Sequence, residues 1–446
     1  MILESIKKYP KLQEYYHASG HYYTSYPSLN HWTEDFSEIE YRERLKTFCN
    51  TGKPLHLYLH IPFCAKLCTY CLCNVIISND EEKMKVFVDH LVKEIELLRE
   101  FPLNIREIHF GGGTPSHLPR VEFARLCDAL NTVCDLHSLD EVAMEIDPRT
   151  VETGDLKFYA DLGITRISFG VQDFDPHVQK AINREQPASM VESVLRDRHF
   201  FKGVNFDLLY GLPKQTHETI AETVRLTKWL SPERITLLKY CHAPELRRHM
   251  KLINVSDLPS PDELPIMFLD ITESLTESGY QWIGLDHFAK PTDSLAQGNL
   301  WRTFNGFTHG RTHDMIGIGP TSTGAFGETY SQSIYDLPGY YSAIEQGRFP
   351  VLRGYRMTED DLLRREVIFS LLCRQEVDLN KYRGYFERER KILQGIPELV
   401  LSRDGMIRIT KWGRVLLRSI CKIFDVKDVA PEHYKIAQLS MTRRAA

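Results

Sequence analysis

Short apolar runs recur along the first half of the chain, and longer amphipathic stretches separate them. The runs are rich in β-branched and aromatic residues and have the length of buried strands. Between the first two runs, residues 80–101 carry apolar side chains at helical spacing with charged side chains opposite, which predicts a crossover helix. The six strands expected in this way are Leu55–Ile61, Arg106–Phe110, Val142–Ile146, Arg166–Val171, Val204–Leu209 and Arg234–Lys239.

This alternation predicts an α/β fold built from βα units around a parallel sheet. Six units between residues 55 and 239 favour an open, partial (β/α)6 barrel, in which the loops at the carboxyl ends of the strands form the active site. A flavodoxin-like sheet remains open from periodicity alone. The expected parts of the chain are an N-terminal arm (1–52), the (β/α)6 core (53–300), a connector that closes the barrel (301–356) and a small α-rich C-terminal domain (357–446).

Composition narrows the functional classes. The chain has 446 residues, of which 42% are hydrophobic, and its formal net charge of −5 comes without a long basic run, so we expect no nucleic-acid partner. No apolar stretch approaches the roughly 18 to 20 residues that span a bilayer. The opening MILESIKKYP lacks the apolar segment of a signal peptide. We therefore expect a cytoplasmic protein that does not bind membranes.

Four of the ten cysteines fall within ten residues, just after the first expected strand. Three of them, Cys64, Cys68 and Cys71, have the spacing C-x3-C-x2-C, which lets their thiolates converge on one iron–sulfur cluster. A [4Fe–4S] cluster held by three cysteines leaves one iron open to bind and activate a small molecule. Cys73 leaves a structural zinc site as an alternative, although such sites usually pair two cysteine knuckles across a longer stretch. Unrelated core cysteines are the third interpretation.

A glycine triplet, Gly111–Gly113, comes directly after the second expected strand and is followed by Thr114 and Pro115. Glycines without Cβ let the backbone approach a ligand closely, and the threonine hydroxyl adds a polar group. A tight turn without a ligand is the alternative. The later segment GIGPTSTG lacks the strand–helix context and the acidic residue of a dinucleotide site, so we expect a loop there.

Together these motifs resemble the radical S-adenosylmethionine (SAM) enzymes, and the similarity is closer still to the oxygen-independent coproporphyrinogen III oxidase family. The resemblance covers roughly residues 22–424, most of the chain. Besides the cysteine and glycine motifs, it rests on Cys73, YTSYP (Tyr23–Pro27), LYLHIPFC (Leu57–Cys64), EIDPR (Glu145–Arg149), GVQDF (Gly170–Phe174), NREQ (Asn183–Gln186), DLLYGLPKQT (Asp207–Thr216) and DHFAKP (Asp286–Pro291).

The resemblance implies that Cys64, Cys68 and Cys71 bind a [4Fe–4S] cluster whose open iron takes SAM, with two SAM molecules expected in all. In the family, an electron from the cluster splits SAM and gives a 5′-deoxyadenosyl radical. Tyr58 and Cys73 are the candidate catalytic residues. The residues expected to contact SAM are Tyr58, Tyr70, Gly112, Gly113, Thr114, Glu145, Gln172, Arg184, Asp207, Cys241, Asn305 and Thr323.

The reaction implied by the resemblance converts two propionates of coproporphyrinogen III to vinyl groups, with loss of CO2, in haem biosynthesis. A tetracarboxylate tetrapyrrole calls for cationic partners, and Lys239, Lys290, Arg302 and Arg311 are candidates by position alone. The sequence shows no flavin or nicotinamide module, so we expect electrons from a separate protein such as flavodoxin or ferredoxin. We expect the protein to be a monomer.

Four positions depart from the family pattern. Tyr22, Cys241, Asn305 and Thr323 stand where arginine, alanine, glutamine and isoleucine are usual, mostly around the second SAM and the substrate arm. The sequence therefore leaves the substrate open. One alternative is a paralogous radical SAM enzyme that uses a second SAM for methyl or methylene transfer, or acts on another tetrapyrrole. The other is a haem-binding chaperone, against which Cys73 and YTSYP argue.

Overall fold

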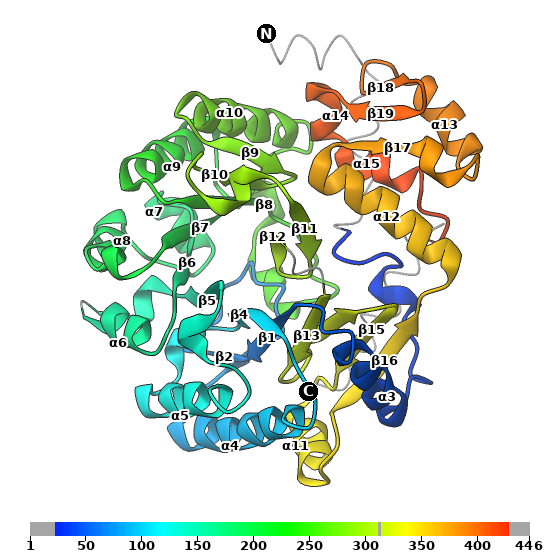
Figure 1. Ribbon diagram of the computed structural model, residues 1–446. Coiled ribbons are helices and arrows are strands. Elements are labelled where there is room, and N and C mark those ends of the chain that lie inside the picture. Colours follow the sequence, from blue (N-terminus) through cyan, green and yellow to red (C-terminus); the bar gives the residue numbers. More distant parts are fainter. Residues whose placement is uncertain (1–22, 153, 311–313, 428–446) are drawn as a thin grey trace. The chain divides into compact units, whose positions relative to one another are not determined.

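The described residues of the protein fall into two compact units. The computed structural model describes residues 23–152, 154–310 and 314–427 (Figure 1). The barrel unit comprises the described residues of 32–259 and 314–355, and the second unit comprises 23–31, 260–310 and 356–427. The four-part division expected from the sequence stays a prediction.

Six parallel strands form the centre of the barrel unit and lie side by side in chain order, β1-β4-β5-β6-β7-β8. A flavodoxin-like sheet has the order 2-1-3-4-5, so the observed order excludes that alternative and confirms the partial (β/α)6 barrel. Each strand lies within two residues of its expected bounds. The bounds are β1 Leu55–Ile61, β4 Ile105–Gly112, β5 Glu141–Ile146, β6 Arg166–Gln172, β7 Gly203–Tyr210 and β8 Arg234–Lys239.

Helices connect consecutive strands and lie on the outer side of the sheet (Figure 1). The first, α4 (Glu81–Leu98), is the predicted crossover helix. Asp80 caps it by accepting bonds from two backbone N–H groups of its first turn, a contribution of typically about 1 kcal/mol. Its apolar face is buried, with Phe87 fully shielded from solvent. The other helices of this unit are α3 Glu38–Cys49, α5 Arg120–Leu130, α6 Asp155–Asp161, α7 Pro176–Ala181, α8 Ala188–Leu195, α9 His217–Leu230 and α11 Leu337–Glu345.

The two faces of β1 differ in character. Its odd-numbered residues are apolar and at most 1% exposed, and they belong to the core between sheet and helices. Its even-numbered residues, His56, Tyr58 and His60, point to the opposite face because side chains alternate along a strand. His109 of β4 and Glu145 of β5 meet them there. The inner face of the barrel is therefore polar, and this is where the site lies.

An antiparallel extension continues the sheet on the other side of β1. β13 (Asp314–Ile318) pairs with β1 in parallel, and β14 (Thr323–Phe326), β15 (Thr329–Ser333) and β16 (Val351–Arg356) follow in order. From its sequence, the segment GIGPTSTG (317–324) is expected to be a loop. This is wrong for its first two and last two residues, which lie in β13 and β14. Only residues 319–322 form a turn, because pairing with the neighbouring strands outweighs the glycine content of the flanks.

The second unit combines helices with small antiparallel sheets. The longest helix of the expected α-rich C-terminal part is α12 (Glu359–Arg374), whose Val367, Leu371 and Leu372 are fully buried in the core of this unit. The α-rich C-terminal part also contains a three-stranded sheet, β17-β19-β18. The remaining elements are α10 Leu264–Glu277, β9 Gln281–Gly284, β10 His287–Ala289, β11 Leu300–Thr303, β12 Gly306–His309, β17 Glu376–Asp378, α13 Glu387–Gln394, β18 Val400–Arg403, β19 Met406–Ile409, α14 Lys411–Val415 and α15 Leu417–Lys422.

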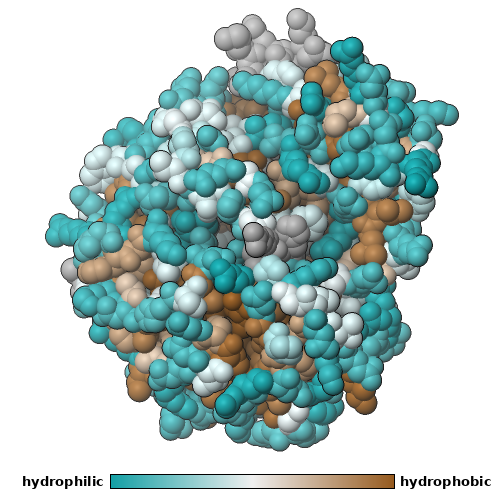
Figure 2. Space-filling view, viewed as in Figure 1, coloured by the Kyte–Doolittle hydropathy of each residue, from teal (hydrophilic) through white to brown (hydrophobic). Residues whose placement is uncertain are grey.

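The surface carries the polarity expected from the composition. Figure 2 shows a face covered largely by hydrophilic residues, with hydrophobic residues in smaller patches between them. Within the described part of the chain, no helix combines the length and the apolar character that crossing a membrane would need.

Candidate active site

The cysteine motif lies in a loop that follows β1 and is closed at its base. Short parallel strands β2 (Phe63–Cys64) and β3 (Ile76–Ile77) pair across the loop. Further along, the N–H of Cys71 donates to the carbonyl of Cys68 over 3.2 Å, which folds this stretch into a turn. Burial, with a smaller contribution from the two neighbouring thiols, raises the pKa of Cys64 to about 12. The three free cysteines thus lie within electrostatic reach of one another.

The donor set is compatible with an iron–sulfur cluster. Among residues 23–152, 154–310 and 314–427, no three His, Cys, Asp or Glu side chains surround one point where an ion could bind. Each cysteine of a [4Fe–4S] cluster binds a different iron, so its three thiols need not surround a single point. Three neighbouring thiols with cationic groups beside them meet the requirement of the cluster.

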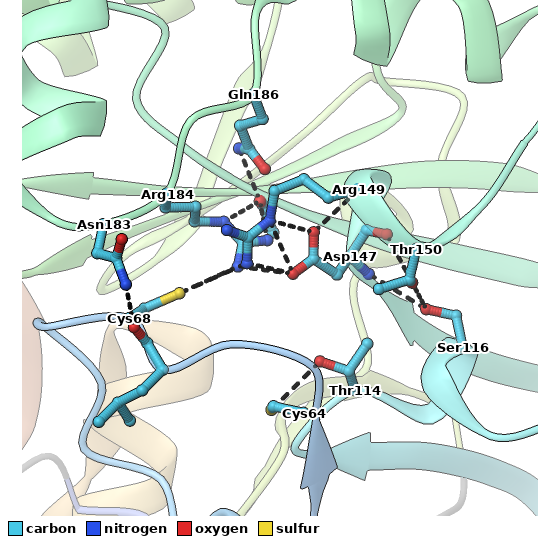
Figure 3. A network of polar contacts seen from close by, with 12 residues as sticks. Cys64, Cys68, Thr114, Ser116, Asp147, Arg149, Thr150, Asn183, Arg184 and Gln186 are labelled. Carbon is cyan, nitrogen blue, oxygen red and sulfur yellow. Dashed lines mark hydrogen bonds and ion pairs between the residues drawn. The ribbon is translucent and has the colours of Figure 1, made fainter. Parts of the chain in front are cut away.

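Two arginines from other parts of the barrel reach the middle cysteine (Figure 3). Arg149, just after β5, and Arg184, in the loop between α7 and α8, each place an Nη atom 3.6 Å from Cys68 Sγ. Asp147 lies between them and accepts bonds of 2.6 Å from Arg149 and 3.0 Å from Arg184. Burial favours the neutral acid, but the two guanidiniums outweigh it and lower the pKa of Asp147. Cys68 therefore faces two cations whose charge one carboxylate only partly offsets.

Two side chains from the segment after β8 hold the backbone next to Cys71. His249 Nε2 lies 2.8 Å from the Cys71 carbonyl oxygen, and Arg247 Nε lies 2.9 Å from that of Leu72. A carbonyl oxygen only accepts, so His249 carries its proton on Nε2. These bonds fix the shape of a loop that has almost no regular structure of its own.

The glycine triplet packs directly against the cysteine loop. A Cβ on Gly113 would lie 2.6 Å from the backbone of that loop, and Gly112 has a φ of +111°, so neither position tolerates a side chain. The N–H groups of Gly113 and Thr114 donate to carbonyls at the end of β1 and the start of β2, over 2.7 and 2.8 Å. Since these two donors bind the protein itself, a ligand at this motif would meet its carbonyl oxygens instead.

Tyr58 belongs to a hydrogen-bonded chain on the inner face. Its hydroxyl lies 3.0 Å from His60 Nδ1, and His60 Nε2 lies 3.2 Å from the carbonyl oxygen of Asn74. Because that carbonyl only accepts, Nε2 carries the proton and Nδ1 accepts from Tyr58. Burial raises the pKa of Tyr58 well above its ordinary value and lowers the pKa of His60. Both side chains are therefore neutral near neutral pH, and Tyr58 is held as a donor to His60.

Glu145 and Asp207 are the acidic candidates on this face. Glu145 accepts from His109 Nε2 over 3.0 Å and from the N–H of Gly112 over 3.3 Å. Asp207 accepts from the Ser168 hydroxyl over 2.8 Å. Burial and then the charge of Glu145 raise the pKa of Asp207. A cationic group bound near both carboxylates would relieve this repulsion.

The remaining predicted residues of the barrel unit lie at strand ends or in loops. Gln172 ends β6 with a φ of +65°, Cys241 follows β8 and is exposed, and Thr323 begins β14. Tyr70, in the cysteine loop, has its pKa raised by burial. Arg184 lies in a loop, because α7 ends at Ala181 and α8 begins at Ala188.

Other predicted residues do not belong to this constellation as described. Lys239 ends β8 within the barrel unit, while Lys290, Arg302 and Asn305 belong to the second unit. Tyr22 and Arg311 lie outside the described residues. Cys73, in contrast, lies beside the site, because the neighbouring Cys71 thiol lowers the pKa of Cys73.

Sequence reasoning gave no role to five residues that contribute to the site. They are His60, His109, Asp147, Arg149 and His249. The letters LHLYLHI of β1, polar at every second position within a buried strand, are the signal that could have indicated the inner-face histidine. His249 lies 178 positions from its partner carbonyl, and no local pattern indicates that pairing.

Comparisons with known proteins agree with this geometry. Residues 58–227 match the Radical SAM superfamily. The chain is 36% identical over 435 residues to the oxygen-independent coproporphyrinogen III oxidase of Escherichia coli (strain K12), covering 92% of this chain and 93% of that protein. Its Helicobacter pylori counterpart is 37% identical over 437 residues, with 92% and 94% covered. The solved structure of the E. coli coproporphyrinogen III oxidase, described as a radical SAM enzyme, gives a TM-score of 0.85 at 36% identity and covers 91% of this chain and 97% of that one.

Proposed function

The chain belongs to the oxygen-independent coproporphyrinogen III oxidase family of radical SAM proteins, and on this premise we propose that it converts two propionates of coproporphyrinogen III to vinyl groups. The product is protoporphyrinogen IX, an intermediate of haem biosynthesis. Each conversion removes one hydrogen atom and one electron from the substrate and releases CO2. The observation that carries the proposal is the gathering of the free Cys64, Cys68 and Cys71 on one loop after β1, with two guanidiniums at the middle thiol.

In this proposal the three cysteines hold a [4Fe–4S] cluster whose open iron takes SAM. When bound, the cluster and SAM together supply the radical that abstracts hydrogen from the substrate. Glu145 and Asp207 offer negative charge to the cationic parts of SAM, and the glycine triplet offers carbonyl acceptors. Tyr58 is fixed by His60 and forms a rigid wall of the site, because its hydroxyl is already engaged.

Further features of the proposal concern the partners. Two SAM molecules bind, with Gln172 and Arg184 among their contacts, and Cys73 packs near the reacting groups without binding iron. Lys239 is the cation of the barrel unit that we assign to a substrate propionate. Electrons come from an external protein such as flavodoxin or ferredoxin, and the enzyme acts in the cytoplasm as a monomer.

Anaerobic turnover tests the proposal directly. Reconstituted protein is incubated with SAM, dithionite and coproporphyrinogen III, and the tetrapyrroles are analysed by mass spectrometry. Two successive mass losses, each matching one CO2 and two hydrogens, support the proposed reaction, and omission of SAM is the control. Formation of 5′-deoxyadenosine without any change in substrate mass would favour a paralogous radical SAM enzyme. Stoichiometric haem binding without SAM cleavage would favour the chaperone and overturn the proposal.

A further inference from the structure

We propose that Arg149 is a positioning residue that raises the reduction potential of the iron–sulfur cluster by holding positive charge against the sulfur of Cys68. This inference rests on the proposed function, because it takes Cys68 as a cluster ligand. It assigns a role to a residue that the resemblance left without one.

Among the residues that the structure describes, the Arg149 side chain makes polar contacts with Asp147 and Cys68. Its Nε lies 3.0 Å and its Nη2 2.6 Å from the two carboxylate oxygens of Asp147, a bidentate pair, and the same Nη2 lies 3.6 Å from Cys68 Sγ. Arg184 differs, because it also donates twice to the carbonyl of Gly170, over 3.1 and 2.7 Å, and so fixes the end of β6. A substitution of Arg149 therefore changes the charge near Cys68 without removing hydrogen bonds to a strand, which a substitution of Arg184 would do.

The charges at this place do not cancel. Asp147 contributes one negative charge and the two arginines contribute two positive charges, so the group carries a net +1. The side chains of Asp147, Arg149 and Arg184 are 7%, 17% and 8% exposed, which limits screening by solvent and salt.

Reduction adds one electron to a cluster that already carries thiolate charge. A nearby cation stabilises the reduced form more than the oxidised form, and hydrogen bonds to a ligating sulfur act in the same direction. The bidentate grip of Asp147 keeps the Arg149 guanidinium at Cys68 and prevents it from turning to solvent. The arrangement thus makes the cluster easier to reduce by the external electron donor.

The test is the reduction potential of the reconstituted holoenzyme, measured by an anaerobic titration followed by electron paramagnetic resonance. Arg149→Gln should lower the one-electron equilibrium constant of reduction about tenfold, a shift of about 59 mV to more negative potential. Arg149→Lys, which keeps the charge, should recover most of this shift. Arg106→Gln is the matched control, because it makes the same charge change in an exposed pair with Asp140 at the start of β4 and should leave the potential unchanged.

A second variant predicts the opposite sign. Asp147→Asn removes the negative charge while keeping an acceptor for both arginines, so it should raise the potential. This variant decides the matter if Arg149→Gln fails to retain a cluster. Equal reduction potentials in wild type and Arg149→Gln, or a lower potential in Asp147→Asn, would overturn this inference. The proposed function would stand in that case, because the wild type would still cleave SAM. A wild type that binds no cluster would overturn the proposed function as well.

Discussion

The two ends of β5 carry the same set of charges in different settings. At the start of the strand, Glu141 is held by Arg166, over 2.8 Å, and by Arg234, over 3.0 Å. We call these three residues the start triad. They lie on β5, β6 and β8, on the inner face of the barrel. Burial favours the neutral acid, but the two guanidiniums hold the pKa of Glu141 below its ordinary range.

Just past the end of the strand, Asp147, Arg149 and Arg184 form the end triad, again one carboxylate between two arginines. Here Arg149 lies in the short 3-10 helix Pro148–Thr150 and Arg184 lies in a loop, and both also reach Cys68 Sγ. The start triad joins three strands to one another, whereas the end triad joins segments that follow strands to a sulfur. From this comparison we infer that the same set of charges stabilises the fold where its partners are strands, whereas at Cys68 we propose that it tunes the cluster.

Replacing Cys68, the sulfur that the end triad contacts, should have the largest effect on activity. It should leave the stability provided by the start triad unchanged. Cys68→Ser should reduce cluster iron and SAM cleavage to background, because serine is a poor iron ligand, while the apo protein unfolds at nearly the wild-type temperature. Iron analysis and 5′-deoxyadenosine assays measure this. Cys134→Ser, at a half-buried cysteine outside the motif, should keep both values. Retention of a full cluster in Cys68→Ser would contradict the assignment.

Breaking the start triad should cost stability instead. Glu141→Gln leaves two largely buried arginines without their carboxylate, and the loss of one partner from a buried pair costs about 3–5 kcal/mol in the free energy of unfolding. Urea denaturation measures the difference. Because the pKa of Glu141 is depressed, its stabilising effect is present above its unfolded pKa of about 4.5 and is lost as the pH falls further. The gap between variant and wild type should therefore shrink in acid; a gap that does not depend on pH would contradict this account.

Glu94 is a buried carboxylate whose hydrogen-bond partners are neutral, and it can be compared with the arginine-bound carboxylates of the two triads. Glu94 of α4 accepts from the Tyr340 hydroxyl, over 2.5 Å, and from the N–H of Gly319, over 2.8 Å. Burial raises its pKa to about 7, and the two hydrogen bonds offset this only in part. The folded state thus keeps a proton that the unfolded chain has lost, so stability falls between about pH 4.5 and pH 7.

Glu94→Gln should remove this penalty while keeping an oxygen acceptor. We expect a gain of up to roughly 3 kcal/mol in the free energy of unfolding at about pH 8, and little change at about pH 4. Denaturation curves at the two pH values measure the difference. An equal effect at both would show that Glu94 is not the titrating group.

The smallest effect is expected at Cys73. The Cys71 thiol lowers the pKa of Cys73, and Cys73 is not part of the three-cysteine spacing. Cys73→Ser keeps a hydrogen-bonding group, so the iron content should equal that of the wild type, whereas Cys71→Ser should lose it. Iron analysis of the two variants measures this difference. Loss of iron from Cys73→Ser would show that Cys73 is a ligand.

The sequence predicted those parts of the molecule that are encoded locally. The spacing of apolar residues predicted the exact first and last residues of β1 and β8. The spacing of the cysteines predicted an iron–sulfur cluster. The β18–β19 hairpin was missed although Asp404 and Gly405, both with positive φ, form the turn residues typical of such hairpins. The pairing of Asp147 with Arg184, 37 positions apart, depends on which strands become neighbours, and no local pattern reveals it.

The alternating faces of β1 have a consequence for protein engineering. Its odd positions maintain the core and its even positions point to the inner face that carries the candidate site, so a mutant library restricted to the even positions would vary that site while leaving the core between sheet and helices unchanged. The substrate preference of such a barrel can therefore change through the even positions while the residues that stabilise the fold stay the same.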